Sequence, residues 1–202
     1  MSQEIELKFR ISRKAIEQLP VFIESLQVRH EASHIVLQIS HYLDTPELLL
    51  QQKGIALRLR KEGDQYIQTL KRENSVNQGL HQRDEYEEKI EGMRIELNKL
   101  PKTFMDLLAP IKDQLHCIFS TEFDRTIWLL KLNEGTTIEC ALDIGRVVAK
   151  DHQEKFAELE LELKEGSIDS LLEIAAKFKS ALELIPEDKS KAERGYALYE
   201  TR

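Results

Sequence analysis

Three short segments of this sequence alternate charged and apolar residues in a way that could bind cations and anions together. They are Glu4-Ile5-Glu6-Leu7-Lys8, Leu57-Arg58-Leu59-Arg60 and Glu158-Leu159-Glu160-Leu161-Glu162. Successive side chains of a strand point to opposite faces, so each segment gathers its charges on one face. Carboxylate oxygens suit divalent cations such as Mg²⁺, and arginine and lysine suit phosphate. The pattern therefore indicates chemistry on a metal-chelated phosphate chain.

The charges of these segments are sorted by sign, which needs a physical reason. Residues i and i+2 of a strand lie about 7 Å apart, and two like charges at that distance repel by roughly 2 kcal/mol at an effective dielectric near 20. A divalent cation would reverse this term for the carboxylates, and a polyanion would reverse it for the arginines. Alternation alone does not say which face is inside, so an ordinary barrel with a solvated charged face stays an alternative.

Further charged residues follow the same alternation in other segments. Lys71 ends an apolar stretch, Arg125 begins one, and the region after residue 188 is rich in bases. Taken singly, each such residue is more often a surface charge than a ligand. The remaining candidates are Glu85, Glu87, Glu139, Asp143, Lys189, Lys191 and Arg194.

Period-two alternation predicts that most of the chain is extended. Eight or nine strands joined mostly by short turns favour an antiparallel sheet that closes into a barrel. The predicted strands are Glu4–Ile11, Ile35–Leu43, Ile55–Lys61, Tyr66–Lys71, Arg83–Ile90, Ile118–Phe123, Arg125–Leu132, Thr137–Ile144 and Phe156–Lys164. The segment 73–79 is predicted to be a loop.

Four segments are predicted to be helical and to flank the sheet. The first begins after Ser12 and runs to about Leu26, with a kink or break at Pro20. The second begins at Asp44-Thr45-Pro46 and ends at Gly54. The others are Thr103–Leu108 and a helix that begins near Ser167 or Ser170. The expected class is therefore α+β, with residues 1–202 forming a single domain.

Composition excludes several classes of protein. The net charge is −7 and the sequence pI is near 5.5, so generic binding to nucleic acid or to a membrane surface is not expected. The first ten residues carry no apolar signal region, and two cysteines without metal-type spacing suit reduced thiols, so we expect a cytoplasmic protein. The sequence has no glycine-rich phosphate loop, no zinc-type histidine pair and no Gly-x-Ser-x-Gly element.

The ordered set of motifs resembles the CYTH, or triphosphate tunnel, family. The Glu-x-Glu-x-Lys segment at Glu4–Lys8 looks like the N-terminal signature of that family. The resemblance continues to residue 196 and looks closest to bacterial inorganic triphosphatases, some of which carry a further C-terminal helical domain. The other matching segments are 42–46, 54–60, 69–71, 141–143, 157–164 and 190–196.

This resemblance implies an eight-stranded antiparallel tunnel that binds triphosphate with Mg²⁺ or Mn²⁺ at its acidic side. Catalysis would depend on Glu4, Glu6 and Lys8. The metal ligands it implies are Glu4, Glu6, Asp143, Glu158, Glu160 and, with a weaker match, Glu162. The phosphate-binding residues it implies are Lys8, Arg58, Arg60, Lys71, Arg125 and Lys191, with Lys189 and Arg194 as alternatives.

The function expected from the resemblance is hydrolysis of inorganic tripolyphosphate to pyrophosphate and phosphate. Thiamine triphosphate ranks second, nucleoside triphosphates and long polyphosphate are further alternatives, and cyclisation of ATP ranks well behind because no residue set specifies a base pocket. A non-catalytic polyphosphate-binding module is a rival, although the acidic residues would weaken binding of a bare polyanion. The sequence does not predict an oligomeric state.

Overall fold

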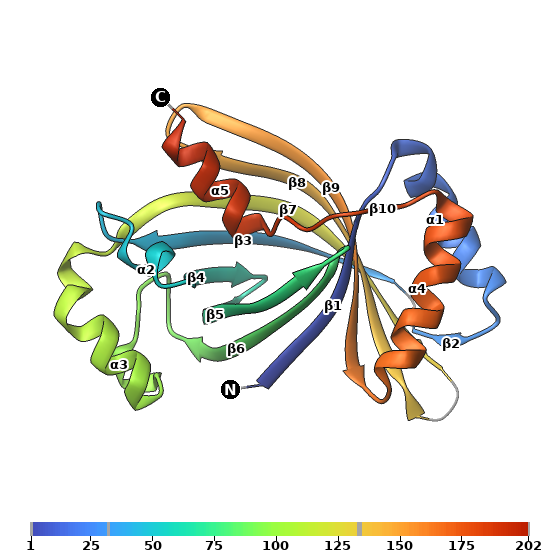
Figure 1. The fold of residues 1–202 in the computed structure, drawn as a ribbon, viewed down its shortest axis with the longest axis horizontal. Coiled ribbons are helices and arrows are strands. Elements are labelled where there is room, and N and C mark those ends of the chain that lie inside the picture. The colour runs from blue at the N-terminus through green and yellow to red at the C-terminus, as the bar shows by residue number, and fades with distance from the viewer. Residues whose placement is uncertain (1, 32, 133–134, 202) are drawn as a thin grey trace.

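The computed structural model describes residues 2–31, 33–132 and 135–201, and within them eight strands close into an antiparallel barrel (Figure 1). β1 closes the ring, because it pairs with β6 along one edge and with β9 along the other. The α+β barrel predicted from the sequence is therefore confirmed. In order around the barrel, the strands are β1 (Ser2–Arg10), β6 (Leu80–Ile90), β5 (Gln65–Asn77), β4 (Ile55–Glu62), β3 (His34–Asp44), β7 (His116–Lys131), β8 (Thr137–Ala149) and β9 (His152–Glu165).

Two helices, α1 (Arg13–Ser25) and α4 (Ile168–Leu182), cover one end of the barrel on its outside (Figure 1). They form the main core with the apolar side chains of the alternating strands, such as Phe9 and Leu161, and with their own residues, such as Leu19. Because the apolar half of each alternating strand packs outward under these helices, its charged half must point into the barrel.

The remaining elements include two short helices at the opposite end of the barrel and two short strands that pair with its wall (Figure 1). A second apolar cluster includes Leu57 and Leu70 of the barrel wall together with Leu108. None of the helices in the described ranges is long and apolar enough to cross a membrane. The short elements outside the barrel are α2 (Leu49–Gln52), α3 (Lys102–Leu108), the 3₁₀ turns Leu97–Lys99 and Ala109–Gln114, the strand β2 (Arg29–His30), which pairs with β7, and the strand β10 (Ile185–Pro186), which pairs with β1.

The C-terminal helix α5 (Lys191–Glu200) lies across β7, β8 and β9. Its first turn is closed by a capping box: the backbone N–H of Glu193 donates to Ser190, and the side chain of Glu193 accepts from the N–H of Ser190. Gly195 lets the helix approach the ring of Phe119, because a Cβ at that position would meet two ring carbons at 2.1 Å. The helix therefore begins at a fixed point and lies against the barrel wall.

Several predicted boundaries were wrong. The helix expected from Asp44 to Gly54 is reduced to α2, because the Asp44 carboxylate accepts the backbone N–H groups of Leu50 and Gln51 at 2.9 Å and caps a single turn. Pro20 neither ends nor splits α1, which runs unbroken and buries Ala15, Leu19 and Ile23. Packing of that face outweighs the one backbone hydrogen bond that proline removes.

Two predicted breaks in the sheet are also absent. The segment 73–79 was expected to be a loop, but β5 continues to Asn77, which pairs with Leu80 across a turn at Gln78 and Gly79. The two strands expected on either side of Asp124 are one strand, β7. The alternation of inward and outward side chains stays in phase through Asp124, so nothing interrupts the ladder there.

Candidate active site

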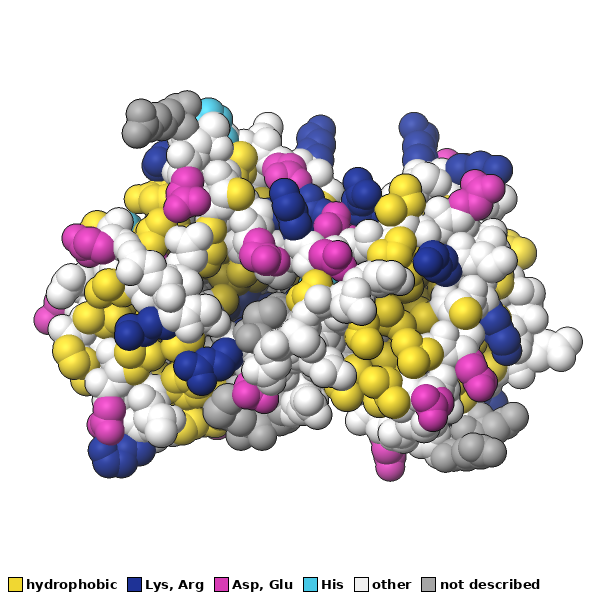
Figure 2. Space-filling view, in the orientation of Figure 1, with side chains coloured by type: hydrophobic (Ala, Val, Ile, Leu, Met, Phe, Trp, Pro, Cys, Tyr) yellow, Lys and Arg dark blue, Asp and Glu magenta, His cyan; other side chains and the backbone are white. Residues whose placement is uncertain are grey.

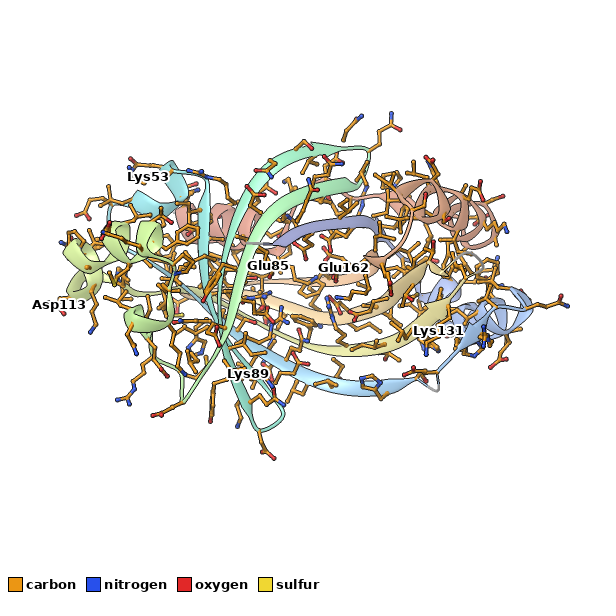
Figure 3. All side chains as sticks on the ribbon, turned by 90° about the horizontal axis from the view of Figure 1, so that it is seen from below. Lys53, Glu85, Lys89, Asp113, Lys131 and Glu162 are labelled. Atoms are coloured by element: carbon orange, nitrogen blue, oxygen red, sulfur yellow. The ribbon has the colours of Figure 1, made fainter. Side chains whose placement is uncertain are left out.

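A cavity of about 710 Å³ lies inside the barrel and is lined by charged side chains of both signs. Glu4 of β1, Arg58 of β4 and Glu160 of β9 all border it. Figure 3 shows Glu85 and Glu162 near the middle of the molecule, with Lys53, Asp113 and Lys131 at its periphery. The alternative of a solvated charged face is therefore wrong for these strands. The volume is within the range of about 300–1,000 Å³ typical of small-molecule sites.

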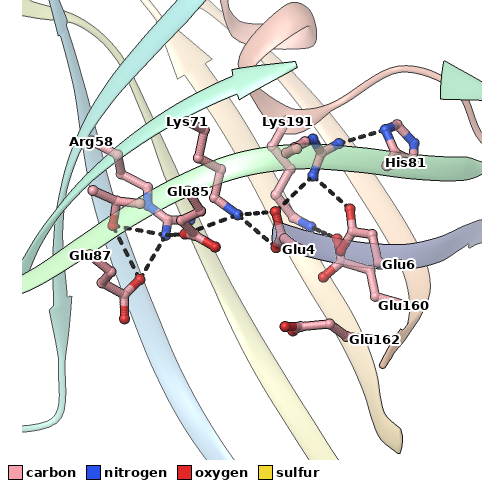
Figure 4. Close-up of polar contacts among 12 residues, drawn as sticks. Glu4, Glu6, Arg58, Lys71, His81, Glu85, Glu87, Glu160, Glu162 and Lys191 are labelled. Carbon is pink, nitrogen blue, oxygen red and sulfur yellow. Dashed lines mark hydrogen bonds and ion pairs between the residues drawn. The ribbon is translucent and has the colours of Figure 1, made fainter. Parts of the chain in front are cut away.

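The first group of ion pairs surrounds Glu4 (Figure 4). Lys71 Nζ lies 2.8 and 2.9 Å from the two carboxylate oxygens of Glu4 and 3.3 Å from Glu85. Arg58 reaches Glu85 at 3.7 Å and Glu87 at 3.6 Å. Burial raises the pKa of Glu4, but the ammonium of Lys71 is the main group that outweighs this effect, so the net pKa is lowered. Glu4 is therefore held as a carboxylate inside the barrel.

The second group lies where α5 meets the barrel. Lys191 Nζ lies 2.8 Å from Asp143, 2.9 Å from Glu158 and 2.7 Å from Glu160. Arg125 donates two hydrogen bonds of 2.7 Å to Asp143 and also bonds Glu160. Burial lowers the pKa of Lys191, but the three carboxylates outweigh it and raise this pKa well above its usual value. Lys191 is thus held as an ammonium among the three carboxylates.

Glu6 and Lys8 continue the inner face of β1. The Glu6 carboxylate accepts a 2.7 Å hydrogen bond from Arg83 of β6, and both side chains are buried. Lys8 is 1% exposed, and burial lowers the pKa of its ammonium although Glu158 and Glu6 partly offset this. The three residues of the Glu-x-Glu-x-Lys segment therefore all point into the barrel.

Glu162 lines the cavity together with two other carboxylates that influence it, Glu4 and Glu139. Lys164 Nζ is 2.8 Å from Glu162 and 3.7 Å from Glu139. Burial raises the pKa of Glu162 to about 7 despite Lys164, and the charges of Glu4 and Glu139 act in the same direction. A hard divalent cation among these carboxylate oxygens would relieve that repulsion, so the donor set fits Mg²⁺ or Mn²⁺.

The acidic residues are spread along the ladder and do not form a tight shell. Across the described ranges, no three His, Cys, Asp or Glu side chains are grouped closely enough to hold a metal ion as they stand. Instead, Glu4, Glu6 and Glu160 each bond to a lysine or an arginine. A cation that binds here must therefore exchange places with the barrel's own ammonium and guanidinium groups.

Arg60 lies close enough to two other lining arginines, Arg58 and Arg125, to feel their charge. Its Nη1 lies 3.5 Å from Glu62, and its Nε has no hydrogen-bond partner among the described residues. Burial lowers the pKa of Arg60 to about 10, and the nearby charges of Arg58 and Arg125 add to this shift. An anion between these three guanidinium groups would stabilise all of them.

The structure brings most of the predicted site residues together, but not all. Asp143 and Glu158 are fully buried behind Lys191 and do not border the cavity. Lys189 is exposed, and Arg194 bonds Glu154 and Glu187 outside the cavity. Those that line it are Glu4, Glu6, Lys8, Arg58, Arg60, Lys71, Arg125, Glu160, Glu162 and Lys191.

The charged lining residues that sequence reasoning missed include Arg83 and Lys164, and it did not place α5. Arg83 shares a strand face with Glu85 and Glu87, and Lys164 shares one with Glu162, so the period of two would have found both. The Ser190-x-x-Glu193 pattern is a capping-box signature that would have indicated the start of α5.

Comparison with known proteins agrees with the fold and the arrangement of motifs. The family model described as the CYTH domain matches residues 2–196. The chain is 31% identical over 198 residues to an inorganic triphosphatase of Haemophilus influenzae, and 32% identical over 119 residues to YjbK of Bacillus subtilis. The first match covers 98% of this chain and 55% of the Haemophilus protein, and the second covers 57% of this chain and 54% of YjbK. The chain thus spans about half the length of these relatives.

Solved structures show the same fold at lower identity. The Hippeastrum protein HpAC1, described as having a dominant triphosphatase activity, superposes with a TM-score of 0.69 at 17% identity, over 98% of this chain and 100% of that one. The Pyrococcus horikoshii protein PH1012 superposes with a TM-score of 0.58 at 20% identity, over 94% and 98% of the two chains.

Proposed function

Because this chain belongs to the CYTH domain family, we propose that it hydrolyses inorganic tripolyphosphate to pyrophosphate and phosphate in a metal-dependent reaction. The observation that carries the proposal is one cavity in which six of the predicted phosphate-binding bases and four of the predicted metal-binding acids meet. The Haemophilus relative supports it, since its name is inorganic triphosphatase and the match covers nearly all of this chain.

The basic residues would bind and orient the phosphate chain. Arg58 and Arg60 of β4 and Arg125 of β7 line the same cavity, and phosphate oxygens beside them would offset the repulsion that Arg60 meets from the other two. Lys71 and Lys191 would add point charges from β5 and α5. Phosphoryl transfer depends mainly on positioning and on stabilising charge in the transition state, and these groups supply both.

The acidic residues would hold Mg²⁺ or Mn²⁺ through Glu4, Glu6, Glu160 and Glu162. Such a cation, when bound, lowers the charge on phosphate oxygens and the pKa of an attacking water. Asp143 and Glu158 would contribute indirectly, because their ion pairs hold Lys191 and Arg125 in position. Lys8 would stabilise the charge that develops on the leaving pyrophosphate.

The direct test is phosphate release from tripolyphosphate, thiamine triphosphate, ATP and long polyphosphate, each with Mg²⁺, with Mn²⁺ and with a chelator. We expect tripolyphosphate to be hydrolysed with the highest kcat/KM and activity to be lost with the chelator. Binding of tripolyphosphate without hydrolysis under any metal condition would replace the proposal with a non-catalytic binding module.

Arg60→Met gives a sharp test of the site, because Arg60 lies beside two like charges. Its removal relieves repulsion in the folded protein, so the melting temperature should be unchanged or higher, whereas kcat/KM should fall about 100-fold. The matched control is Arg72→Met, at an exposed arginine of the neighbouring strand β5, which should leave kcat/KM unchanged. Equal activity of the two variants would refute the assignment of Arg60.

Three further expectations belong to this proposal. We propose that residues 1–202 act as one domain, since the eight barrel strands and the C-terminal helix α5 all contribute residues to one cavity. A cytoplasmic location remains a prediction, supported by two free cysteines, Cys117 and Cys140. The proposed partner is a small triphosphate, without nucleic acid or membrane.

A further inference from the structure

Arg83 is a buried cation of the cavity that no motif assigned to the site. It lies on β6, it is 6% exposed, and its side chain borders the cavity. Its Nη1 lies 2.7 Å from Glu6 and 3.6 Å from Glu4, and its Nη2 lies 2.6 Å from Nδ1 of His81. One branch of the guanidinium therefore faces the acids of β1, while the other bonds a histidine.

His81 fixes the position of this guanidinium. The imidazole is fully buried, and its Nε2 lies 3.0 Å from the backbone carbonyl of Glu187. A carbonyl only accepts and a guanidinium only donates, so Nε2 must carry the hydrogen and Nδ1 must accept from Arg83. Glu187 in turn donates its own N–H to the carbonyl of Lys8. Arg83 is thus tied to the segment that leads into α5.

The surroundings of Glu187 add charge at the same place. Its carboxylate bonds Arg194 of α5 and lies 3.5 Å from Arg10. Figure 2 shows side chains of both signs gathered in the middle of this face, where Figure 1 shows β10 and the start of α5. The support behind His81 is therefore itself held by ion pairs from two elements.

We propose that Arg83 exchanges partners during binding: it neutralises Glu6 before metal binds, and it binds a phosphate oxygen of the substrate once a divalent cation takes the Glu6 carboxylate. The inference rests on the proposed function, because it takes Glu6 as a metal ligand. Arg83 would then be a further substrate-binding residue, and His81 would be its positioning residue.

The exchange follows from the chemistry of a buried arginine. Guanidinium does not lose its proton in proteins, so a buried Arg83 needs an anionic partner at every stage. His81 supplies an acceptor nitrogen to one branch of the guanidinium. When the Glu6 carboxylate binds a metal cation, Arg83 loses it as a partner. A phosphate oxygen in the same cavity is a suitable replacement partner, since the planar fork of arginine matches phosphate geometry.

This arrangement couples metal and substrate. A cation that binds to Glu6 alone must break the buried 2.7 Å pair between Arg83 and Glu6, and the loss of this pair weakens the binding of the cation. A cation that binds with the phosphate chain does not meet this cost. By thermodynamic reciprocity, the metal must strengthen substrate binding by the same factor.

The test compares Arg83→Met with wild type in a calorimetric titration with Mn²⁺ and no substrate. Removing the competing cation should tighten Mn²⁺ binding about tenfold, whereas the KM for tripolyphosphate should rise about tenfold. A residue with only a structural role would weaken both. Unchanged or weaker Mn²⁺ binding in a folded Arg83→Met protein overturns the inference.

Two further variants complete the experiment. Arg146→Met removes an arginine from an exposed pair with Glu122 at 2.9 Å and should change neither quantity. Arg83→Lys keeps a cation beside Glu6, so Mn²⁺ binding should stay near that of wild type while the KM still rises; an unchanged KM counts against the inference, even if Arg83→Met does not fold. If wild type binds Mn²⁺ but hydrolyses no triphosphate, the proposed function fails, and the titrations still decide whether Arg83 competes for Glu6.

Discussion

Gly195→Ala tests whether the close approach of α5 to the barrel positions Lys191. The new Cβ would lie 2.1 Å from both Cδ2 and Cε2 of Phe119, where an ordinary contact is 3.4–4 Å, so the helix or the ring must move by more than about 1 Å. The ring has little freedom to do so. It is stacked on Tyr42 with 4.4 Å between centroids, and it meets the edge of Tyr196 at 5.1 Å.

Two opposing effects set the size of the change. Alanine favours a helix interior by about 1 kcal/mol over glycine, whereas overpacking a close contact costs about 1–3 kcal/mol. The net loss of about 1 kcal/mol should lower the melting temperature by about 2–4 °C for a chain of this size. A shift of about 1 Å would also move Lys191 away from three carboxylates that now lie at 2.7–2.9 Å. Misplacement of that size typically lowers the rate by up to about 100-fold.

The assay combines thermal melting, hydrogen exchange of residues 191–200 and kcat/KM for tripolyphosphate. We expect faster exchange in α5 and a fall in kcat/KM of about 10- to 100-fold, which is far more than the small loss of stability explains. Gly92→Ala is the matched control, since a Cβ there meets nothing within 4 Å. If Gly195→Ala behaves like Gly92→Ala in exchange and kcat/KM, the helix does not position Lys191 through this contact.

Three other predictions use thermal or chemical unfolding of the metal-free protein. Burial raises the pKa of Glu162 to about 7, so between pH 4.5 and 7 the folded chain retains a proton that the unfolded chain has released. The free energy of unfolding therefore falls as the pH rises through this range. Glu162→Gln should therefore raise the free energy of unfolding by up to about 3 kcal/mol at pH 8 and by much less at pH 5; an equal gain at both pH values would contradict this. Tyr196→Phe removes a buried 2.9 Å hydrogen bond to Asp44 and should lower the free energy of unfolding in urea by about 1 kcal/mol. An unchanged free energy of unfolding would contradict a stabilising role of this bond. Phe178→Ala empties a fully buried site beside Phe22 and should cost about 3–5 kcal/mol, while the folded fraction keeps its KM for tripolyphosphate.

Local alternation was enough to predict the barrel and most of the charged residues that line it. The same period that separates Glu4 from Ile5 also separates Arg58 from Leu59, so the inner and outer sets were correct on each strand. Periodicity could not decide which set faced the cavity. That choice depends on where α1 and α4 pack, which is a long-range property.

The errors arose where a distant contact overrides a local preference. Pro20 is tolerated because Leu19 and its neighbours are buried against the barrel, and the helix expected after Asp44 is short because the Asp44 carboxylate takes backbone donors and the hydroxyl of Tyr196. Arg83 was not predicted because no motif includes it, although the alternation along its strand would have placed it on the inner face. Its bond to His81, by contrast, depends on a segment more than a hundred residues away.

The position of β1 in the ring has a consequence for biosynthesis. Its partners β6 and β9 end at residues 90 and 165, so β1 leaves the ribosome well before β9 and must wait for it before both of its edges are covered. Pairings between residues so far apart in the chain make folding slow. Until then, the strand that carries Glu4 and Glu6 presents an open edge, and its charges would discourage pairing with other nascent chains.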